Sequence, residues 1–326
     1  MAYKIAVIGS FRKHYKEVCE TLDTFRKMEI GVTSPKGTAI CGSIKAFVIF
    51  ESDNSEYTPE EIQMITLEKI LSADVVYVCN PRGYVGRTTC YEIGFCYSRN
   101  KPLYFLCSPK DLPMPVVDEQ IVSPEEMGQI ILNGKKRIFE PGMCQTALDS
   151  YHNIFSSVTG DEKLEKGVKK LVICGSMEFF PEMMDCQTLL KRHDIRAIIP
   201  KEEGTITEAY TDVAFREFKR KVSRAYLKKI REKDTEAVLI YNGEKHGQQN
   251  YIGANTLVEI AMAFTWNRKI YLYNDIYEPL QDELLAWGCI CLKGNMERLI
   301  DGLKATCEEK DKEYRQLSMF EDFTNL

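Results

Sequence analysis

YVGRTTCYEIGFCY (residues 84–97) and YIGANTLVEIAMAF (residues 251–264) are two versions of one segment, with a Tyr, a Gly, a Thr and a Glu at matching positions. Further segments match in the same order: KIAVIGSF at 4–11 with KLVICGSM at 170–177, and NKPLYFL at 100–106 with NRKIYLY at 267–273. The spacing is kept as well, since 83 positions separate Gly9 from Glu92 and 84 separate Gly175 from Glu259. The sequence therefore contains two copies of one unit.

Each copy alternates short apolar runs with segments of helical periodicity, which is typical of a mostly parallel sheet covered by helices on both faces. We predict an α/β protein with two tandem doubly wound sheets of the Rossmann-like or flavodoxin-like kind. The first unit is expected at 1–133 and the second at 167–308. Residues 134–166 combine a Pro-Gly turn with helical periodicity and predict a partly helical connector, and 309–326 form a C-terminal tail.

The composition is that of an ordinary globular protein, because 28% of the 326 residues are charged, 44% are hydrophobic and the net charge is -5. This balance does not favour direct binding to nucleic acid. The N-terminus has no basic leader and no run approaches about 18 apolar residues, so we expect a cytoplasmic protein without a membrane segment. The 12 cysteines include no C-x-x-C pair, and neither a metal-ligand cluster nor a G-x-G-x-x-G fingerprint occurs. Reduced thiols and no metal or cofactor are therefore expected.

The repeated segment is expected at the carboxyl ends of the strands, where ligands of open α/β sheets bind. Gly86 and Gly253 allow a ligand to approach the backbone closely. Polar residues after these glycines are candidates for capping the next helix and for binding a ligand: Thr88, Thr89, Asn255 and Thr256.

Glu92 and Glu259 follow in the first turns of that helix, where the positive helix end favours an ionised carboxylate. A carboxylate beside a sugar ring can attack or stabilise an oxocarbenium-like centre as a glycosidic bond breaks. The alternative is that each Glu caps its helix or pairs with a nearby Lys or Arg.

Two further features each have two interpretations. Gly9-Ser10 and Gly175-Ser176 are either ordinary strand-to-helix turns or sugar and phosphate sites at a helix N-terminus. Residues 41–61 have no counterpart in the second copy, and they form either a specificity lid or an edge strand with a loop.

These segments resemble the nucleoside 2-deoxyribosyltransferase superfamily, which also contains the 2'-deoxynucleoside 5'-phosphate N-hydrolases. The resemblance rests on the strand ending VICGS, the apolar strand led by Asp, and the G-x-x-T-x-x-E-I helix followed by NKPLYFL, and it covers most of both halves. It implies that Glu92 and Glu259 are nucleophiles that take the deoxyribosyl group. It also implies contacts to sugar or phosphate from Gly9, Ser10, Gly175 and Ser176. Members of the family build active sites across a dimer interface, which implies that the two copies form a pseudo-dimer.

The chain departs from the family pattern at three places. The first strand has no Tyr, and the expected polar residue six positions before each Glu is Gly86 or Gly253. Thr66 and Tyr226 stand where the family has the Asp that handles the proton of the leaving base. General acid catalysis contributes about 10²–10⁴-fold, so a site that keeps only the Glu is expected to bind nucleotides while turning over slowly or not at all. A second interpretation is that the copies complement each other, with His152 or His246 entering a site.

The two copies also differ in their cations. Arg82 and Arg87 stand beside the first motif and are candidates for holding a phosphate, whereas the second copy has Lys245 and His246. We therefore rank Glu92 slightly above Glu259.

The expected activity is cleavage or exchange of the base of a nucleoside, nucleotide or related N-glycoside. NPRGYVGRTTCYEI (residues 80–93) also resembles the Pro-Gly-Gly-x-Gly-Thr-x-x-Glu motif of phosphoribohydrolases, which release bases from nucleoside monophosphates. The alternative from another class is a catalytically degraded nucleotide sensor or interaction module in nucleotide-linked defence or signalling.

The tail suggests a protein partner. QLSMF, Gln316–Phe320, resembles the short peptide by which bacterial proteins dock to the DNA sliding clamp. A polar anchor with two apolar side chains suits a hydrophobic pocket. The alternative is that the apolar tail side chains pack against the body of the protein.

Overall fold

The computed structural model describes residues 3–37, 39–44, 47–50, 56–110, 112, 114, 116–134, 169–200 and 226–304. The expected connector beyond Gly134, with His152, and the expected tail, with Gln316–Phe320, lie outside the described residues.

The first unit alternates strands and helices along the chain: β1 (Lys4–Gly9), α1 (Tyr15–Lys27), β2 (Gly31–Ser34), β3 (Ile40–Ile44), β4 (Phe47–Phe50), α2 (Pro59–Leu71), β5 (Val75–Cys79), the 3-10 turn η1 (Pro81–Gly83), α3 (Arg87–Ser98), β6 (Leu103–Phe105), η2 (Asp118–Gln120) and α4 (Pro124–Leu132). Two of these helices begin at the same local pattern, Ser/Thr-Pro-Glu-Glu. Thr58 caps α2 and Ser123 caps α4, and in each case the Glu three residues later bonds back to the amide of the cap. This reciprocal capping, with Pro as the first helical residue, fixes where the helices start.

The second unit repeats the alternation: β7 (Lys169–Gly175), η4 (Met177–Phe179), α6 (Phe180–Lys191), β8 (Ile195–Ile198), β9 (Thr235–Tyr241), α8 (Ala254–Thr265), β10 (Lys269–Leu272), η5 (Glu278–Leu280), α9 (Gln281–Ala286) and β11 (Ile290–Cys291). Residues 226–231 and 296–304 are also helical.

Both units contain a parallel sheet with the same strand order. The first sheet runs β2-β1-β5-β6 and the second runs β8-β7-β9-β10-β11, with every neighbouring pair parallel. Numbered within each sheet, the first reads 2-1-3-4 and the second 2-1-3-4-5, as in flavodoxin-like sheets. An isolated parallel bridge from Phe105 to Ile121 stands where β11 completes the second sheet. The prediction of two tandem doubly wound sheets is confirmed.

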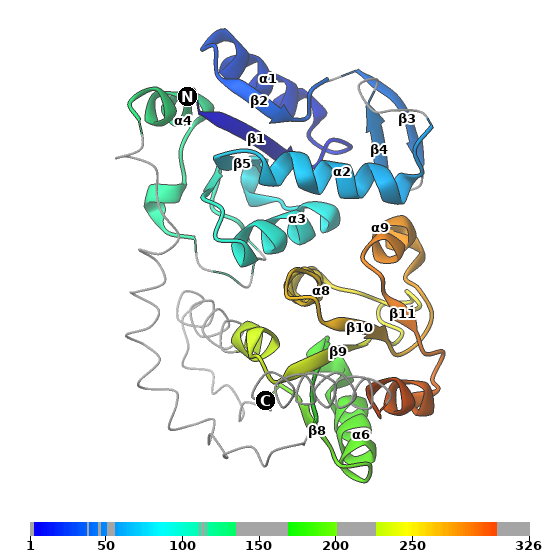
Figure 1. Cartoon of the computed structure of the whole chain (residues 1–326). Helices are drawn as coiled ribbons and strands as arrows, with labels where there is room; N and C mark the ends of the chain where they lie inside the picture. The colour runs from blue at the N-terminus through cyan, green and yellow to red at the C-terminus, as the bar shows by residue number, and fades with distance from the viewer. Residues whose placement is uncertain are drawn as a thin grey trace, which may run out of the picture.

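Helices cover both faces of the first sheet (Figure 1). Ile5 and Val7 of β1 pack in the core beneath α1 and α4, whereas Ala6 and Ile8 pack in the core beneath α2 and α3. β5 is buried along its whole length, as expected of a central strand with helices on both sides.

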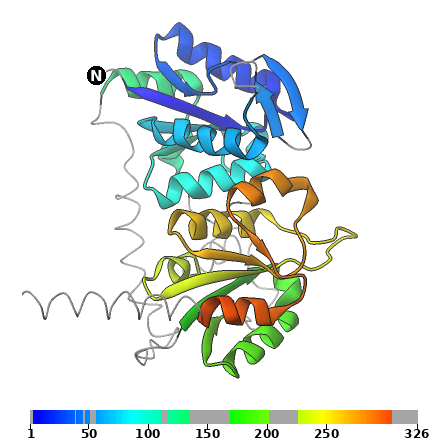
Figure 2. The same ribbon diagram turned by 45° about the vertical axis from the view of Figure 1, so that its right-hand side comes forward.

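α3 and α8, which carry the two copies of the repeated segment, pack against each other between the units (Figures 1 and 2). A Cβ atom added to Gly94 would lie 3.0 Å from Cβ of Ala261 and 3.1 Å from Cα of Val258. Gly94 and Ala261 occupy the same position of their copies, so two small residues meet where the helices cross. The inner faces of both units also merge into one apolar cluster. The two units thus form a pseudo-dimer within one chain.

Of residues 41–61, the described ones form most of an antiparallel hairpin and the start of α2. The hairpin, β3 and β4, lies beside α2 in Figure 1. Phe50, its last residue, meets Phe11 edge to face with ring centroids 4.9 Å apart.

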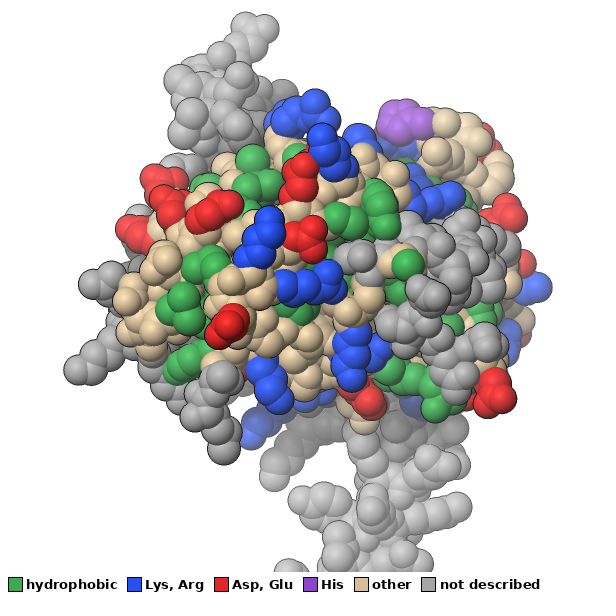
Figure 3. All heavy atoms as spheres, turned by 90° about the horizontal axis from the view of Figure 1, so that it is seen from above, with side chains coloured by type: hydrophobic (Ala, Val, Ile, Leu, Met, Phe, Trp, Pro, Cys, Tyr) green, Lys and Arg blue, Asp and Glu red, His purple; other side chains and the backbone are tan. Residues whose placement is uncertain are grey.

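The described surface of the first unit has mixed charge. Viewed from above, Lys and Arg side chains alternate with Asp and Glu (Figure 3). None of the described helices is both long and apolar enough to span a bilayer.

Candidate functional site

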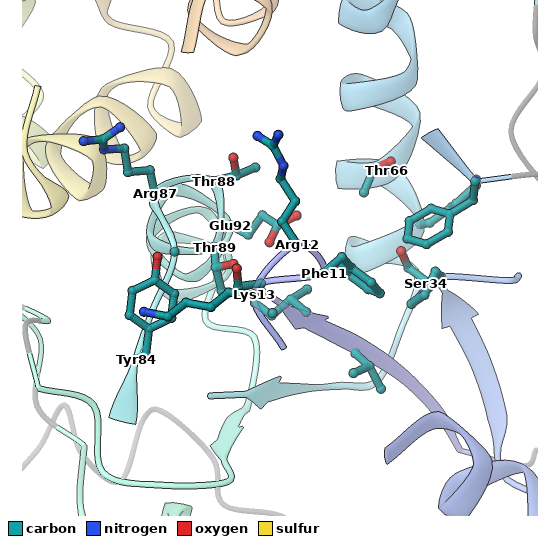
Figure 4. Close-up of a pocket in the computed structure, with 18 of the residues that line it drawn as sticks. Phe11, Arg12, Lys13, Ser34, Thr66, Tyr84, Arg87, Thr88, Thr89 and Glu92 are labelled. Atoms are coloured by element: carbon teal, nitrogen blue, oxygen red, sulfur yellow. The ribbon is translucent and has the colours of Figure 1, made fainter. Parts of the chain in front are cut away.

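A cavity of about 590 Å³ lies in the first unit, between the carboxyl ends of β1 and β2 and the start of α3 (Figure 4). Its walls are formed by Val7, Ile8, Gly9, Ser10, Phe11, Arg12, Lys13, Ser34, Pro35, Lys36, Phe50, Thr66, Lys69, Tyr84, Gly86, Arg87, Thr88, Thr89, Glu92, Pro279 and Leu280. Among the first-copy residues that the sequence singled out, Arg82 lines a smaller adjoining cavity instead. The structure brings the others together at the larger one: Gly9, Ser10, Gly86, Arg87, Thr88, Thr89 and Glu92. We call the larger one the Glu92 cavity.

The glycine of each Gly-Ser pair is explained by strand packing. A Cβ atom on Gly9 would lie 2.6 Å from the carbonyl oxygen of Cys79, and one on Gly175 would lie 2.8 Å from that of Tyr241. The turn after Ser10 closes on itself, because the Ser10 carbonyl accepts hydrogen bonds from two amides that follow it, and α1 begins only at Tyr15. Ser10 therefore lies in a turn at the cavity wall, not at the N-terminus of a helix.

Glu92 lies on α3 at the cavity wall, and its side chain is 9% exposed. Burial raises the pKa of Glu92 to about 8, and the negative charge of Glu283 adds to this rise. The prediction that the helix N-terminus favours the ionised form is wrong for Glu92, because loss of solvation outweighs the helix dipole at this depth. Without a ligand, Glu92 is therefore mainly protonated at neutral pH.

The second unit completes the Glu92 cavity. Pro279 and Leu280, in the turn before α9, line its wall. Glu283 on α9 is 2% exposed and accepts a 3.0 Å hydrogen bond from the hydroxyl of Thr88. The negative charge of Glu283 acts on Glu92, so the site takes groups from both copies.

Sequence reasoning missed Glu283. The segment QDELLAW has acids in the first turn of a helix, which is an ordinary pattern at a helix N-terminus. Nothing local distinguishes Glu283 from a solvated surface acid.

The predicted capping roles of the polar residues in the repeated segment are wrong. The N-caps of α3 and α8 are Gly86 and Gly253, and neither helix has a side-chain cap hydrogen bond. Thr88 lies inside the first turn of α3 and bonds to the other unit instead. Thr89 and Thr256 are buried at 3% and 4% exposure.

The position at which the resemblance leads one to expect an Asp has different surroundings in the two copies. Thr66 on α2 lines the Glu92 cavity, and its hydroxyl donates to the carbonyl of Ile62 at 2.8 Å. In the second unit, the hydroxyl of Tyr226 donates hydrogen bonds to the carbonyls of Ile173 and Ile198, towards the carboxyl ends of β7 and β8. The larger side chain thus occupies this edge of the second sheet.

The second-copy candidates line neither the Glu92 cavity nor the smaller cavity beside it: Gly175, Ser176, Gly253, Asn255, Thr256 and Glu259. Burial raises the pKa of Glu259 to about 8, against the opposing effect of a hydrogen bond with Cys174. The helix N-terminus therefore fails to keep Glu259 ionised as well. One shielded oxygen of Glu259 has no hydrogen-bond partner among the described residues.

The second-copy cations are also placed differently from expectation. Lys245 donates a 2.9 Å hydrogen bond to the hydroxyl of Ser176 and forms a 2.6 Å ion pair with Glu178. His246 is exposed and lines neither cavity. A lysine of this chain thus binds the serine that the resemblance assigned to sugar or phosphate.

All but one of the described charged residues that line the Glu92 cavity are cations: Arg12, Lys13, Lys36, Lys69 and Arg87. Glu92 is the only acid among the described residues that line it. Arg87 also contacts the second unit, with its guanidinium 5.1 Å from the ring centroid of Tyr277. This excess of positive charge favours an anionic ligand. Within the described ranges, no three His, Cys, Asp or Glu side chains gather as metal ligands.

Comparisons with known proteins add little to this geometry. A scan against protein-family models finds no match, and a search of the curated proteins finds none. Among solved structures, the chain is similar to a protein from Listeria monocytogenes assigned as a candidate UDP-N-acetylglucosamine 2-epimerase. The identity is 12% and the TM-score 0.28, over 95% of this chain and 88% of that chain.

Proposed function

We propose that the first unit cleaves or exchanges the base of a nucleoside, nucleotide or related N-glycoside, with Glu92 as the nucleophile. The observation that carries this proposal is the position of Glu92, a nearly buried carboxyl at the wall of a cavity whose other described charged lining residues are all cations and whose polar ones include hydroxyl groups. The cations suit a phosphate on the substrate, and the hydroxyls of Ser10 and Thr89 suit the sugar.

In the proposed reaction, a carboxylate oxygen of Glu92 forms a bond to the anomeric carbon of the sugar while the bond from that carbon to the base nitrogen breaks. The electron pair of the broken bond leaves with the base, which takes up a proton from solvent. Water, or a second base, then attacks the same carbon and releases Glu92. Hydrolysis and base exchange differ only in this second nucleophile.

The reaction requires the ionised form of Glu92, whereas burial and Glu283 favour the protonated form. Positive charge that develops on the sugar beside Glu92 opposes both effects and favours the carboxylate as the bond breaks. The proposed enzyme is therefore expected to gain activity as the pH rises towards 8.

We place the protein in the cytoplasm, and the thiols of the described cysteines, which form no disulfide with one another, support this location.

The test is release of free base, followed by mass spectrometry, from a panel of nucleosides, their 5'-monophosphates and nicotinamide adenine dinucleotide. Glu92→Gln keeps the size of the side chain and removes the nucleophile, and Glu259→Gln is the matched change in the other copy. Loss of release with the first variant and retention with the second assigns the reaction to Glu92. Equal release from the wild-type protein and Glu92→Gln would contradict the proposal.

A nucleotide sensor is the second candidate, and the identity of Thr66 favours it. Thr66 lines the cavity, but its hydroxyl is too weak an acid to donate a proton to a leaving base. A nucleotide bound there would therefore keep its base and remain in the cavity. If no compound in the panel loses its base but a nucleotide raises the melting temperature, the sensor is the correct function.

A further inference from the structure

A second cavity, of about 390 Å³, adjoins the Glu92 cavity. Lys13 and Tyr84 line both cavities, and the ammonium of Lys13 lies 3.5 Å from the ring centroid of Tyr84. Figure 4 shows these two side chains together at one side of the Glu92 cavity. One lysine and one tyrosine therefore form the boundary between the two spaces.

The second cavity is cationic. Lys13, Arg82 and Lys110 line it, and the described lining residues include no acid. His14 also lines it at 2% exposure, and the Nε2 atom of His14 is buried without a hydrogen-bond partner among the described residues. A buried polar atom without a partner, beside three cations, is typical of a site that a polar ligand completes.

The backbone that holds these cations is braced. The side chain of Asn80, 1% exposed, donates to the carbonyl of Cys107 at 2.7 Å and accepts from its amide at 3.0 Å. The amide of Lys110 donates to the carbonyl of Gly83 at 3.1 Å. Arg82 has φ of 56°, a left-handed conformation that is unfavourable for a residue other than Gly. These hydrogen bonds hold together the two backbone segments that carry Arg82 and Lys110.

The second unit repeats the brace, but the lysines beside it are paired with acids. Asn242 bonds to the amide of Asn274 at 2.9 Å and to the carbonyl of Asp275 at 2.8 Å, as Asn80 does in the first unit. There, however, Lys245 is paired with Glu178, and Lys293 lies 3.3 Å from Asp275. The brace is therefore a property of the fold, because both units have it.

We propose that this second cavity binds a phosphate chain, so that the ligand is a nucleotide with two or more linked phosphates. Its sugar lies beside Glu92, and the chain passes Lys13 and Tyr84 to reach Arg82 and Lys110. The assignment of the sugar rests on the proposed function, but the phosphate site rests on the second cavity alone. The linked phosphates belong either to a nucleoside triphosphate or to a dinucleotide, and the two are distinguished below.

The test is calorimetric titration, in EDTA, with the 5'-mono- and triphosphates of the four common 2'-deoxynucleosides and with nicotinamide adenine dinucleotide. We expect at least one compound with linked phosphates to bind about tenfold more tightly than its monophosphate, which corresponds to about 1.4 kcal/mol. The variant carries Arg82→Asn, because Asn tolerates the left-handed backbone, together with Lys110→Gln. It should lose this gain while the dissociation constant of the monophosphate changes by less than about twofold.

Lys191→Ser is the control for loss of surface charge, since Lys191 is exposed on α6 and lines neither cavity. It should keep the gain. The proposal is overturned if no compound with linked phosphates binds more tightly than its monophosphate, or if the double variant keeps the full gain. A gain for the triphosphates alone identifies a nucleoside triphosphate, and a gain for nicotinamide adenine dinucleotide identifies a dinucleotide. Tight binding without base release would refute the proposed reaction while leaving the phosphate site in place.

Discussion

The hydroxyl of Thr88 in the first unit donates a 3.0 Å hydrogen bond to the carboxylate of Glu283 in the second unit, across 195 positions of sequence. This contact lies beside Glu92, whose proton affinity Glu283 raises. The candidate site therefore depends on how the two copies dock, and the second unit acts as a partner of the first site even though its own Glu259 lines neither cavity.

Glu283→Gln should shift the pH dependence of base release to lower pH. The substitution keeps an oxygen that accepts from Thr88 but removes the negative charge that disfavours ionisation of Glu92. We expect the pH profile of kcat/KM to give an apparent pKa near 8 for the wild-type protein. The apparent pKa of the variant should be lower. Thr88→Val is the control, because it removes the hydrogen bond and keeps the charge. A profile unchanged in Glu283→Gln would show that Glu283 does not influence Glu92.

Glu92→Gln should lower the rate of base release by at least about 10²-fold, the lower end of what a single catalytic group contributes. Glu259→Gln should leave the rate within about twofold of the wild type, because Glu259 lines neither cavity. Rates measured by mass spectrometry at pH 8 compare the two directly. A large effect of Glu259→Gln would show that the second copy is active.

Thr66→Tyr should close the Glu92 cavity. The substitution places in the first unit the residue that stands at this position in the second, where Tyr226 is bonded to the ends of β7 and β8. We expect the increase in melting temperature caused by a bound nucleotide to disappear. Thr66→Ser, which keeps the cavity open, should retain it. A normal ligand response in Thr66→Tyr would place the binding site elsewhere.

The free energy of unfolding should fall as the pH rises from about 5 to 8.5. Glu92 and Glu259 each have a pKa near 8 in the folded protein against a usual value of 4.5, so the folded state binds more protons in this range. Their contribution is complete below about pH 4.5 and is lost as the pH passes 8. Urea unfolding at several pH values should show a loss of several kcal/mol, since each unit of pKa shift corresponds to about 1.4 kcal/mol. The double variant Glu92→Gln, Glu259→Gln should flatten the curve, and an equally steep curve would contradict both assignments.

Gly94→Val should destabilise the protein by about 1–3 kcal/mol, the usual cost of overpacking. A Cβ at this position already meets Ala261 and Val258 at close distance. Gly31→Val is the control, since a Cβ on Gly31 would meet only Lys4, at 3.7 Å. Urea unfolding of both variants measures the difference. Equal stability would mean that α3 and α8 separate at little cost.

The sequence by itself determined the duplication, the parallel sheets and the edge where the site residues gather. Apolar runs and helical periods repeat along each copy, and parallel strands all end at the same edge. Gly9 and Glu92 could therefore be predicted to lie near each other even though they are far apart in the chain. Reciprocal capping at Thr58 and Ser123 is similarly local, since the groups involved are three residues apart.

Only the tertiary structure decided that Glu92, and not Glu259, lines the Glu92 cavity, and in which state its carboxyl is held. Helix position predicts an ionised Glu92, but burial and Glu283 reverse that prediction. Likewise, Thr66 and Tyr226 appear in sequence as two equal losses of an Asp, yet one lines a cavity and the other bonds across strand ends. Desolvation and charge act through space, over contacts that join distant parts of the chain, and no local pattern records them.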